Sequence, residues 1–161
     1  MTMIEIRRYA GRPDGFLAMA DTDAAPAFEQ LDIQVAGWLG ERPVIRSGRA
    51  LRYLKPGQAP VIFLPPAALA LKHVRASGTL RMDEFGLAIH LSLSGGGRTA
   101  ADALWYYPGP DPEYAPVAGM LCLDPSLLDR VTADGQVVCR GDLPGTWRPA
   151  GHQPCRAPCV A

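Results

Sequence analysis

The sequence predicts a mainly β protein: one small antiparallel domain with one or two short helices. The chain has 161 residues, and its 17 glycines and 16 prolines are spread along its length, which excludes long helices almost everywhere. The runs between them are short and alternate between apolar and polar residues, as half-buried strands do. A chain of this length buries about 70% of its unfolded surface, enough for a core without disulfides or metals.

The first expected elements are two hairpins. Residues 3–9 alternate as a strand, and residues 15–20 are expected to pair with them across the turn Gly-Arg-Pro-Asp-Gly. Residues 50–54 and 61–64 flank a Lys-Pro-Gly-Gln turn and predict a second strand–turn–strand unit.

Helix signals are few. Residues 26–39 fit two patterns, because Phe28, Leu31 and Val35 have helical spacing while Leu31, Ile33 and Val35 alternate. We predict a helix for the first part of this segment. Residues 66–74 begin with proline followed by good helix formers, which predicts a helix, and residues 126–131 predict one turn.

The clearest strand is predicted at residues 87–93, where four apolar residues alternate with Ala88, His90 and Ser92 before a Gly-Gly-Gly turn. Further strands are expected at 103–107, 117–123 and 136–140. We divide the chain into an N-terminal extension (1–30), a β domain (31–147) and a proline-rich C-terminal tail (148–161).

Charge and hydropathy exclude several classes of protein. Lys plus Arg and Asp plus Glu number 16 each, so the net charge is zero, which argues against a dedicated nucleic-acid binder. The longest apolar stretch, residues 59–71, is broken by three prolines and is too short to span a membrane. The N-terminus has no apolar signal region, so we expect a cytoplasmic protein with reduced thiols.

The order of several short motifs resembles the domain of unknown function 427 family, a family of small bacterial β proteins. The most specific piece is Trp105-Tyr106-Tyr107-Pro108, followed by Ala118-Gly119 and the Asp134-Gly135 turn. The resemblance implies a β-tent fold, in which two antiparallel sheets lean together, and a nucleotidyltransferase-like family label. This chain departs from the family pattern at Met82, where members carry cysteine, and at Phe85, where they carry lysine.

The first candidate site is a polar and aromatic cleft formed by His90, Trp105, Tyr107 and Glu113. Aromatic walls with a few converging polar groups are typical of small-molecule pockets, and His90 could act as a base or a hydrogen-bond donor. The alternative is that the aromatic residues only pack in the core and His90 lies on the surface.

The second candidate is a basic stretch from residue 42 to residue 55, within which Arg46 and Arg52 could bind an anionic ligand. The alternative is an edge strand protected from aggregation by its charges.

Two further sites have weaker support. Cys139, His152, Cys155 and Cys159 have the side-chain chemistry of a zinc site but lack paired Cys-x-x-Cys knuckles. Nucleotidyl transfer needs paired carboxylates and a phosphate loop, and the only Asp-x-Asp, at residues 21–23, lacks that context. We therefore expect no metal and no cofactor.

The sequence favours a non-catalytic domain that binds a small ligand, an anionic one included, or a protein partner. The alternatives are a transferase or hydrolase that uses His90, with Glu113 beside it, and a zinc-stabilised interaction module. Exposed strand edges allow a homodimer but do not require one.

Overall fold

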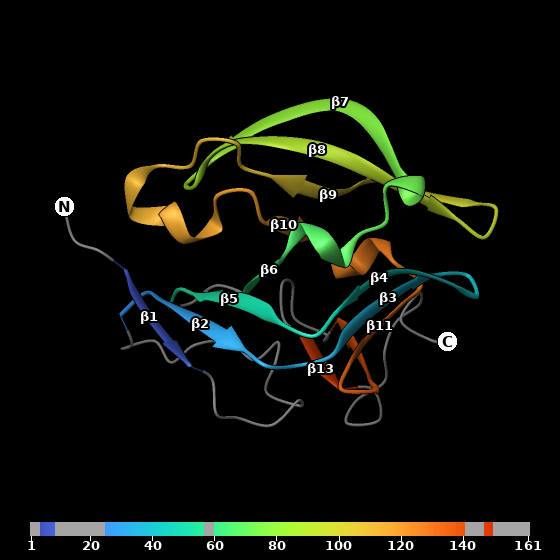
Figure 1. Cartoon of the computed structure of the whole chain (residues 1–161), viewed down its shortest axis with the longest axis horizontal. Helices are drawn as coiled ribbons and strands as arrows, with labels where there is room; N and C mark the ends of the chain where they lie inside the picture. Colours follow the sequence, from blue (N-terminus) through green and yellow to red (C-terminus); the bar gives the residue numbers. More distant parts are fainter. Residues whose placement is uncertain (1–3, 9–24, 57–59, 141–146, 150–161) are drawn as a thin grey trace.

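The computed structural model describes residues 4–8, 25–56, 60–140 and 147–149. Its strands form two sheets that lean against each other (Figure 1). This arrangement confirms the mainly β prediction.

The larger sheet has eight strands. In spatial order they are β1 (Glu5–Arg8), β2 (Ala27–Leu31), β5 (Ala50–Leu54), β6 (Val61–Leu64), β10 (Leu121–Leu123), β9 (Arg98–Tyr106), β8 (Gly86–Gly95) and β7 (Val74–Asp83). All neighbours pair antiparallel except β1 and β2, which run parallel. The expected partner of β1, residues 15–20, lies outside the described residues.

The smaller sheet has five strands: β13 (Trp147–Pro149), β12 (Gln136–Arg140), β11 (Arg130–Ala133), β3 (Val35–Leu39) and β4 (Arg42–Ser47). Short 3-10 turns connect the strands at η2 (Pro66–Ala68), η3 (Leu71–His73), η4 (Pro112–Val117) and η5 (Pro125–Leu127). No helix in the described part of the chain is long and apolar enough to cross a membrane.

The helix predicted in residues 26–39 is wrong, because this segment forms two strands in different sheets. Phe28 and Leu31 are both fully buried, but they point into different cores on the two faces of β2. Val35 then begins β3 in the other sheet. The helical spacing arose because apolar residues of two separate strands happened to fall three or four positions apart.

The helix predicted at residues 66–74 is replaced by η2 and η3, between which Leu69 and Ala70 have extended backbone. The strands expected at 50–54, 61–64, 87–93, 103–107 and 136–140 are present, and the one expected at 117–123 is limited to β10. The sequence did not predict β4 and β7, since both are rich in exposed side chains.

Two cores lie on opposite faces of the larger sheet. We call the core between the two sheets the aliphatic core, because its buried residues are Leu, Ile, Val and Ala only. We call the other the aromatic core, which contains Phe28, Tyr53, Phe63, Phe85, Tyr107 and Tyr114. The turn between β7 and β8 supplies Phe85, and η4 supplies Tyr114, so these connections cover the aromatic face of the sheet.

The β8–β9 turn needs glycine at residue 96. Gly96 has a φ of +58°, and a Cβ there would lie 2.9 Å from the carbonyl oxygen of Leu39. A side chain is therefore disfavoured both by the backbone conformation and by contact with the smaller sheet.

Candidate functional site

A pocket of about 500 Å³ opens where β7, β8 and β9 meet η5. Its volume lies within the range of small-molecule sites. The aromatic and charged residues that line it are Arg81, Asp83, His90, Asp102, Trp105 and Asp124. Two of the six residues that the sequence predicted for a ligand site, His90 and Trp105, are therefore in one pocket.

Strand pairing brings His90 and Trp105 together, because they are directly opposite each other on β8 and β9. Paired residues of antiparallel strands project on the same face, and here the two rings stack with centroids 5.2 Å apart and planes 26° apart. Nδ1 of His90 lies 3.4 Å from the backbone oxygen of Asp102. Because a carbonyl oxygen only accepts, Nδ1 is the donor in this contact.

Trp105 connects the pocket to the aromatic core through a chain of hydrogen bonds. Its indole N–H donates to the Tyr107 hydroxyl (3.0 Å), which donates to Asp83 (2.5 Å). The other Asp83 oxygen accepts the backbone N–H of Phe85 at 2.9 Å. Burial, reinforced by the hydrogen bond to Asp83, raises the pKa of Tyr107 well above its ordinary value. Tyr107 is therefore a neutral donor that orients Asp83 and Trp105.

Asp102 enters the pocket from an irregular part of β9. The register between β8 and β9 shifts at Leu91 and Leu93, and Asp102 has a φ of +55°. Its backbone N–H donates to Ser92 Oγ (3.1 Å), and its carboxylate accepts from Thr79 Oγ1 (3.0 Å). Hydrogen bonding to Ser77 and Thr79, with His90 and Arg81 nearby, lowers the pKa of the Asp102 carboxyl, which is therefore charged at neutral pH.

The three aspartates of the pocket were not predicted from the sequence. Asp83 ends β7, Asp102 lies within β9 and Asp124 follows β10, so no local motif joins them. The one available signal was the Met82–Gly86 segment, where the chain departs from the family pattern. Met82 lines the pocket and is 75% exposed, whereas Phe85 is buried in the aromatic core.

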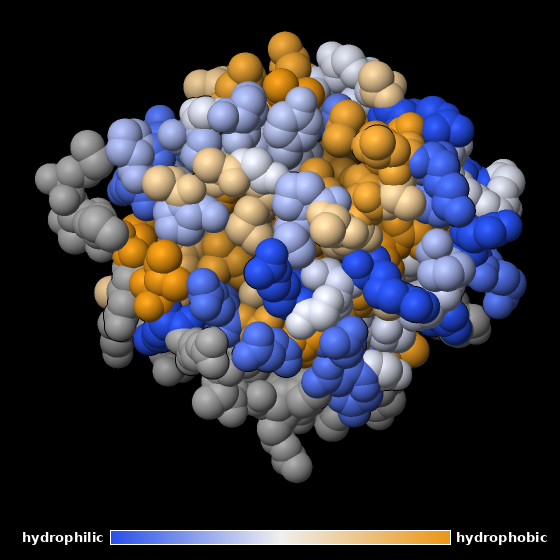
Figure 2. Space-filling view, viewed as in Figure 1, coloured by the Kyte–Doolittle hydropathy of each residue, from blue (hydrophilic) through white to orange (hydrophobic). Residues whose placement is uncertain are grey.

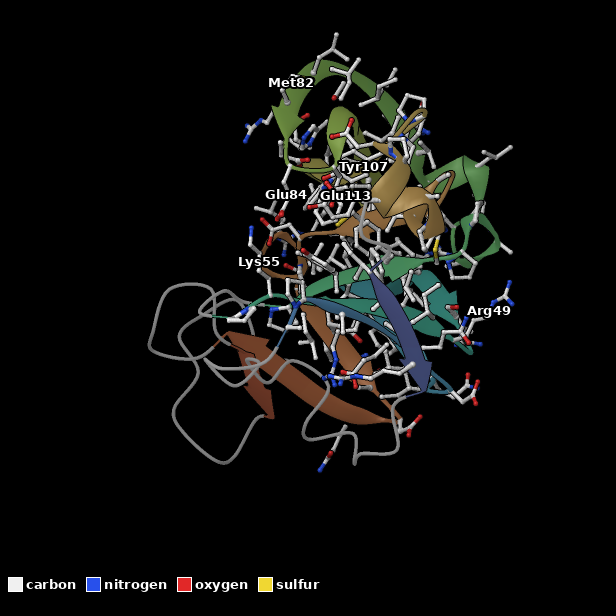
Figure 3. The ribbon with its side chains drawn as sticks, turned by 90° about the vertical axis from the view of Figure 1, so that its left-hand side faces the viewer. Arg49, Lys55, Met82, Glu84, Tyr107 and Glu113 are labelled. Atoms are coloured by element: carbon white, nitrogen blue, oxygen red, sulfur yellow. The ribbon has the colours of Figure 1, made fainter. Side chains whose placement is uncertain are left out.

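Glu113 does not line the pocket. It lies in η4, where its charge acts on Tyr53, Lys55 and Tyr114. Glu84 belongs to the same cluster of polar side chains, since it accepts hydrogen bonds from Lys55 (3.1 Å) and from Tyr114 (3.3 Å). In Figure 3, Lys55 and Glu84 lie on one side of the molecule and Arg49 on the other. The structure thus does not pair Glu113 with His90.

The two predicted arginines also lie away from the pocket and from each other. Arg46 is exposed on β4 of the smaller sheet. Arg52 is on β5 of the larger sheet, buried, and bound to Glu29 at 2.7 Å. Glu29 also accepts from Arg7 at 3.2 Å. The basic stretch is therefore divided between two sheets, and an acidic residue of another strand neutralises Arg52.

The described residues contain no group of three or more His, Cys, Asp or Glu side chains that could hold a metal ion. Three residues of the zinc candidate (His152, Cys155 and Cys159), the side chain of Cys139 and the Asp-x-Asp at 21–23 lie outside what the structure describes. Cys122 is fully buried in β10, and burial raises the pKa of its thiol. It is a core residue, as its apolar strand indicated.

A family model described as Domain of unknown function (DUF427) matches residues 26–134, which include every residue that lines the pocket. No curated protein matches the chain.

Proposed function

Because this chain belongs to the family described as Domain of unknown function (DUF427), a description that assigns no activity, we propose its function from the pocket: it binds a small cationic amine and catalyses no reaction of its own. The observation that carries this proposal is the lining of the His90–Trp105 pocket. This lining contains three aspartates and, against them, one arginine, Arg81.

The hydrogen-bonding capacity of the pocket favours a ligand that donates. Carboxylates accept hydrogen bonds only, and three of them line the pocket. An ammonium group offers up to three donors and a positive charge, so it matches both the acceptors and the excess of negative charge. An anionic ligand, which the basic stretch suggested, is not supported at this site because the aspartates would repel it.

The stacked rings of His90 and Trp105 supply an apolar surface beside these carboxylates. A pocket that combines an aromatic wall with a few fixed polar groups binds the carbon skeleton of a ligand by burial and orients it by hydrogen bonds. The chain of hydrogen bonds through Tyr107 holds the Trp105 ring and the Asp83 carboxylate in place before a ligand arrives. Such preorganisation reduces the entropy cost of binding.

The same geometry argues against catalysis. His90 is oriented by a backbone carbonyl rather than by a carboxylate, and no Ser or Cys hydrogen-bonds to its ring in the contacts described. Tyr107 is held in its protonated form, and the fully buried Cys122 thiol does not line the pocket. The residues that line the pocket are suited to recognition.

Three ligands that share one ring and differ in charge test the proposal: benzylamine, benzyl alcohol and benzoate. We expect benzylamine to raise the melting temperature and to bind in calorimetry, benzyl alcohol to bind weakly and benzoate not to bind. Asp102→Asn should weaken benzylamine about tenfold, the cost of a charge-assisted contact. Asparagine tolerates a positive φ, so this variant is expected to fold.

The matched control is Glu41→Gln, which removes one negative charge at an exposed position between β3 and β4 and should leave affinity unchanged. Trp105→Ala should abolish binding. Equal binding of benzoate and benzylamine, or an Asp102→Asn variant that binds benzylamine as the unmodified protein does, would show that the pocket does not recognise a cation.

A further inference from the structure

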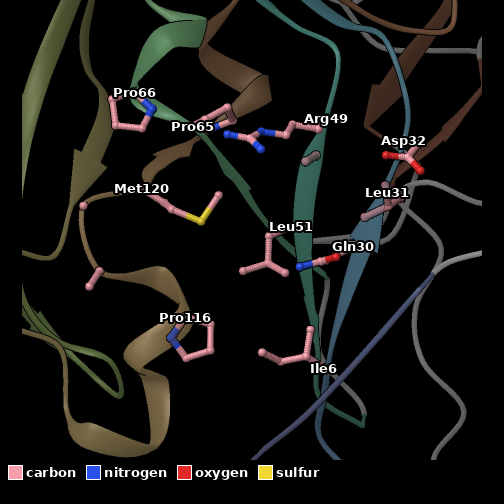
Figure 4. Close-up of a pocket in the computed structure, with 13 residues that line it drawn as sticks. Ile6, Gln30, Leu31, Asp32, Arg49, Leu51, Pro65, Pro66, Pro116 and Met120 are labelled. Atoms are coloured by element: carbon pink, nitrogen blue, oxygen red, sulfur yellow. The ribbon is translucent and has the colours of Figure 1, made fainter.

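A second and larger cavity, of about 750 Å³, lies at the other end of the eight-stranded sheet. It forms a groove between β1, β2 and β5 on one side and the segments that follow β6 and η4 on the other (Figure 4). None of the residues that line it belongs to the His90–Trp105 pocket.

Apolar side chains lie on both sides of the groove, and Gln30, Asp32 and Arg49 are the polar side chains among the described residues that line it. Ile6 and Leu51 form the strand side, and Pro65, Pro116 and Met120 are on the opposite side (Figure 4). Ile6 is 47% exposed and contributes apolar surface to this wall. The prolines have a fixed φ and no N–H, so their wall is rigid and offers no hydrogen-bond donor. This surface suits a hydrocarbon chain better than a polar ligand.

One end of the groove carries a cation. Arg49 is the only cationic side chain among the described residues that line it, and Figure 4 shows its side chain extending from the start of β5 towards Pro65. The Ser47 hydroxyl fixes the Arg49 backbone, since it donates to the carbonyl of Arg49 (2.7 Å) and accepts its N–H (3.3 Å). In the same view Asp32 lies on the other side of β5 from the guanidinium.

We propose that this groove binds an amphipathic monocarboxylate, with its hydrocarbon chain between Leu51 and Met120 and its carboxylate on Arg49. A guanidinium presents two parallel N–H donors whose spacing matches the two oxygens of a carboxylate. The hydrocarbon chain gains from burial against the apolar side chains of the groove. This site is independent of the amine pocket, since the two cavities share no lining residue.

Calorimetry on the full chain with octanoate, 1-octanol and octylamine tests the assignment. Octanoate should bind more tightly than the other two ligands, and each methylene added from hexanoate to octanoate should improve affinity by up to about fourfold. Arg49→Gln should weaken octanoate about tenfold while leaving the melting temperature unchanged, because the guanidinium is exposed.

Arg46→Gln is the matched control. It removes the same charge from an exposed arginine three residues away that does not line the groove. Affinity for octanoate should stay within twofold of the unmodified protein in this control and in Asp102→Asn. The proposal fails if octanol binds as tightly as octanoate, if no octanoate binding is detected, or if Arg46→Gln and Arg49→Gln weaken binding equally.

Discussion

The two faces of the eight-stranded sheet are built from different side chains. The face towards the smaller sheet carries the aliphatic core, in which no aromatic residue is buried. The opposite face carries the aromatic core, in which Phe85 contacts four other rings at centroid distances of 4.6–5.5 Å. One sheet therefore supports two kinds of packing.

The difference follows from what covers each face. Two pleated sheets present regular rows of side chains, which branched aliphatic residues fill well. The aromatic face is covered by a turn and by η4, whose spacing from the sheet is irregular and whose polar groups need partners. Tyrosine meets both needs, because its ring is large and its hydroxyl forms hydrogen bonds, as Tyr107 does with Asp83 and Tyr114 with Glu84.

The difference between the two faces of the sheet also explains where the candidate amine site lies. Strand register puts His90 and Trp105 on the aromatic face, beyond the point where η4 covers it. The surface view shows apolar and polar side chains mixed over β7 and β8 (Figure 2). A sheet face that is incompletely covered by irregular segments leaves room for a pocket, whereas the face packed on a second sheet does not.

The largest expected effect is that of removing the centre of the aromatic core. Phe85→Ala should lower the free energy of unfolding by about 3–5 kcal/mol, because a fully buried ring leaves a cavity. Denaturant unfolding measures this loss, and benzylamine binding should weaken with it, since Phe85 N–H also holds Asp83. Leu104→Ala in the aliphatic core is the control: a comparable loss of stability with benzylamine affinity kept would confirm that the two faces have separate roles. A loss below about 1 kcal/mol for Phe85→Ala would contradict the packing.

The second prediction concerns the ion pair between Arg52 on β5 and Glu29 on the neighbouring strand β2. The Arg52 side chain is on the same face of β5 as Ala50 and Leu54. Arg52 is only 4% exposed, so Arg52→Leu should cost about 3 kcal/mol by leaving the Glu29 carboxylate buried without this partner. Combining it with Glu29→Leu should recover most of that loss, which thermal and denaturant unfolding would both show. If the double variant is as unstable as the single one, the cost lies in packing rather than in charge.

The smallest expected effect is that of removing the Tyr107 hydroxyl while its ring stays in the aromatic core. Tyr107→Phe should cost about 1–2 kcal/mol at neutral pH by removing a partner from Asp83 and Trp105. Since folding raises the pKa of Tyr107, its contribution to stability is present below about pH 10 and declines as the pH rises further, where the unfolded tyrosine ionises. Stability should therefore fall less steeply above pH 10 in Tyr107→Phe than in the unmodified protein or in Tyr106→Phe. Identical slopes in all three would remove Tyr107 as a source of alkaline sensitivity.

Much of the fold could be predicted from local patterns. The alternation at residues 87–93 predicted β8, and the turn at residues 55–58 predicted the pairing of β5 with β6. The helix predicted within residues 26–39 was wrong, because β2 and β3 belong to different sheets. The spacing of Phe28, Leu31 and Val35 does not indicate that the segment is divided between two sheets. It also missed β7, an edge strand whose side chains are mostly exposed and so do not alternate.

The candidate site was only partly predictable. His90 and Trp105 were identified because each stands out within its own strand, and the pairing of β8 with β9 then brings them together. Glu113 was expected with them because it follows Trp105 closely in sequence, but it lies in η4, which contributes no residue to the pocket. Asp83, Asp102 and Asp124 had no sequence signal, because each joins the pocket from a different strand end or bulge.

The sequence by itself determined that the chain is mainly β and located several of its strands, among them β5, β6, β8 and β12, because turn residues and alternation act over a few positions. Family membership follows from the match over residues 26–134. Only the tertiary structure decided which sheet each strand joins, which face Arg52 and His90 point to, and which charges meet in a pocket. Those properties depend on pairing between strands far apart in the chain, and pairing selects faces through a register that no single segment contains.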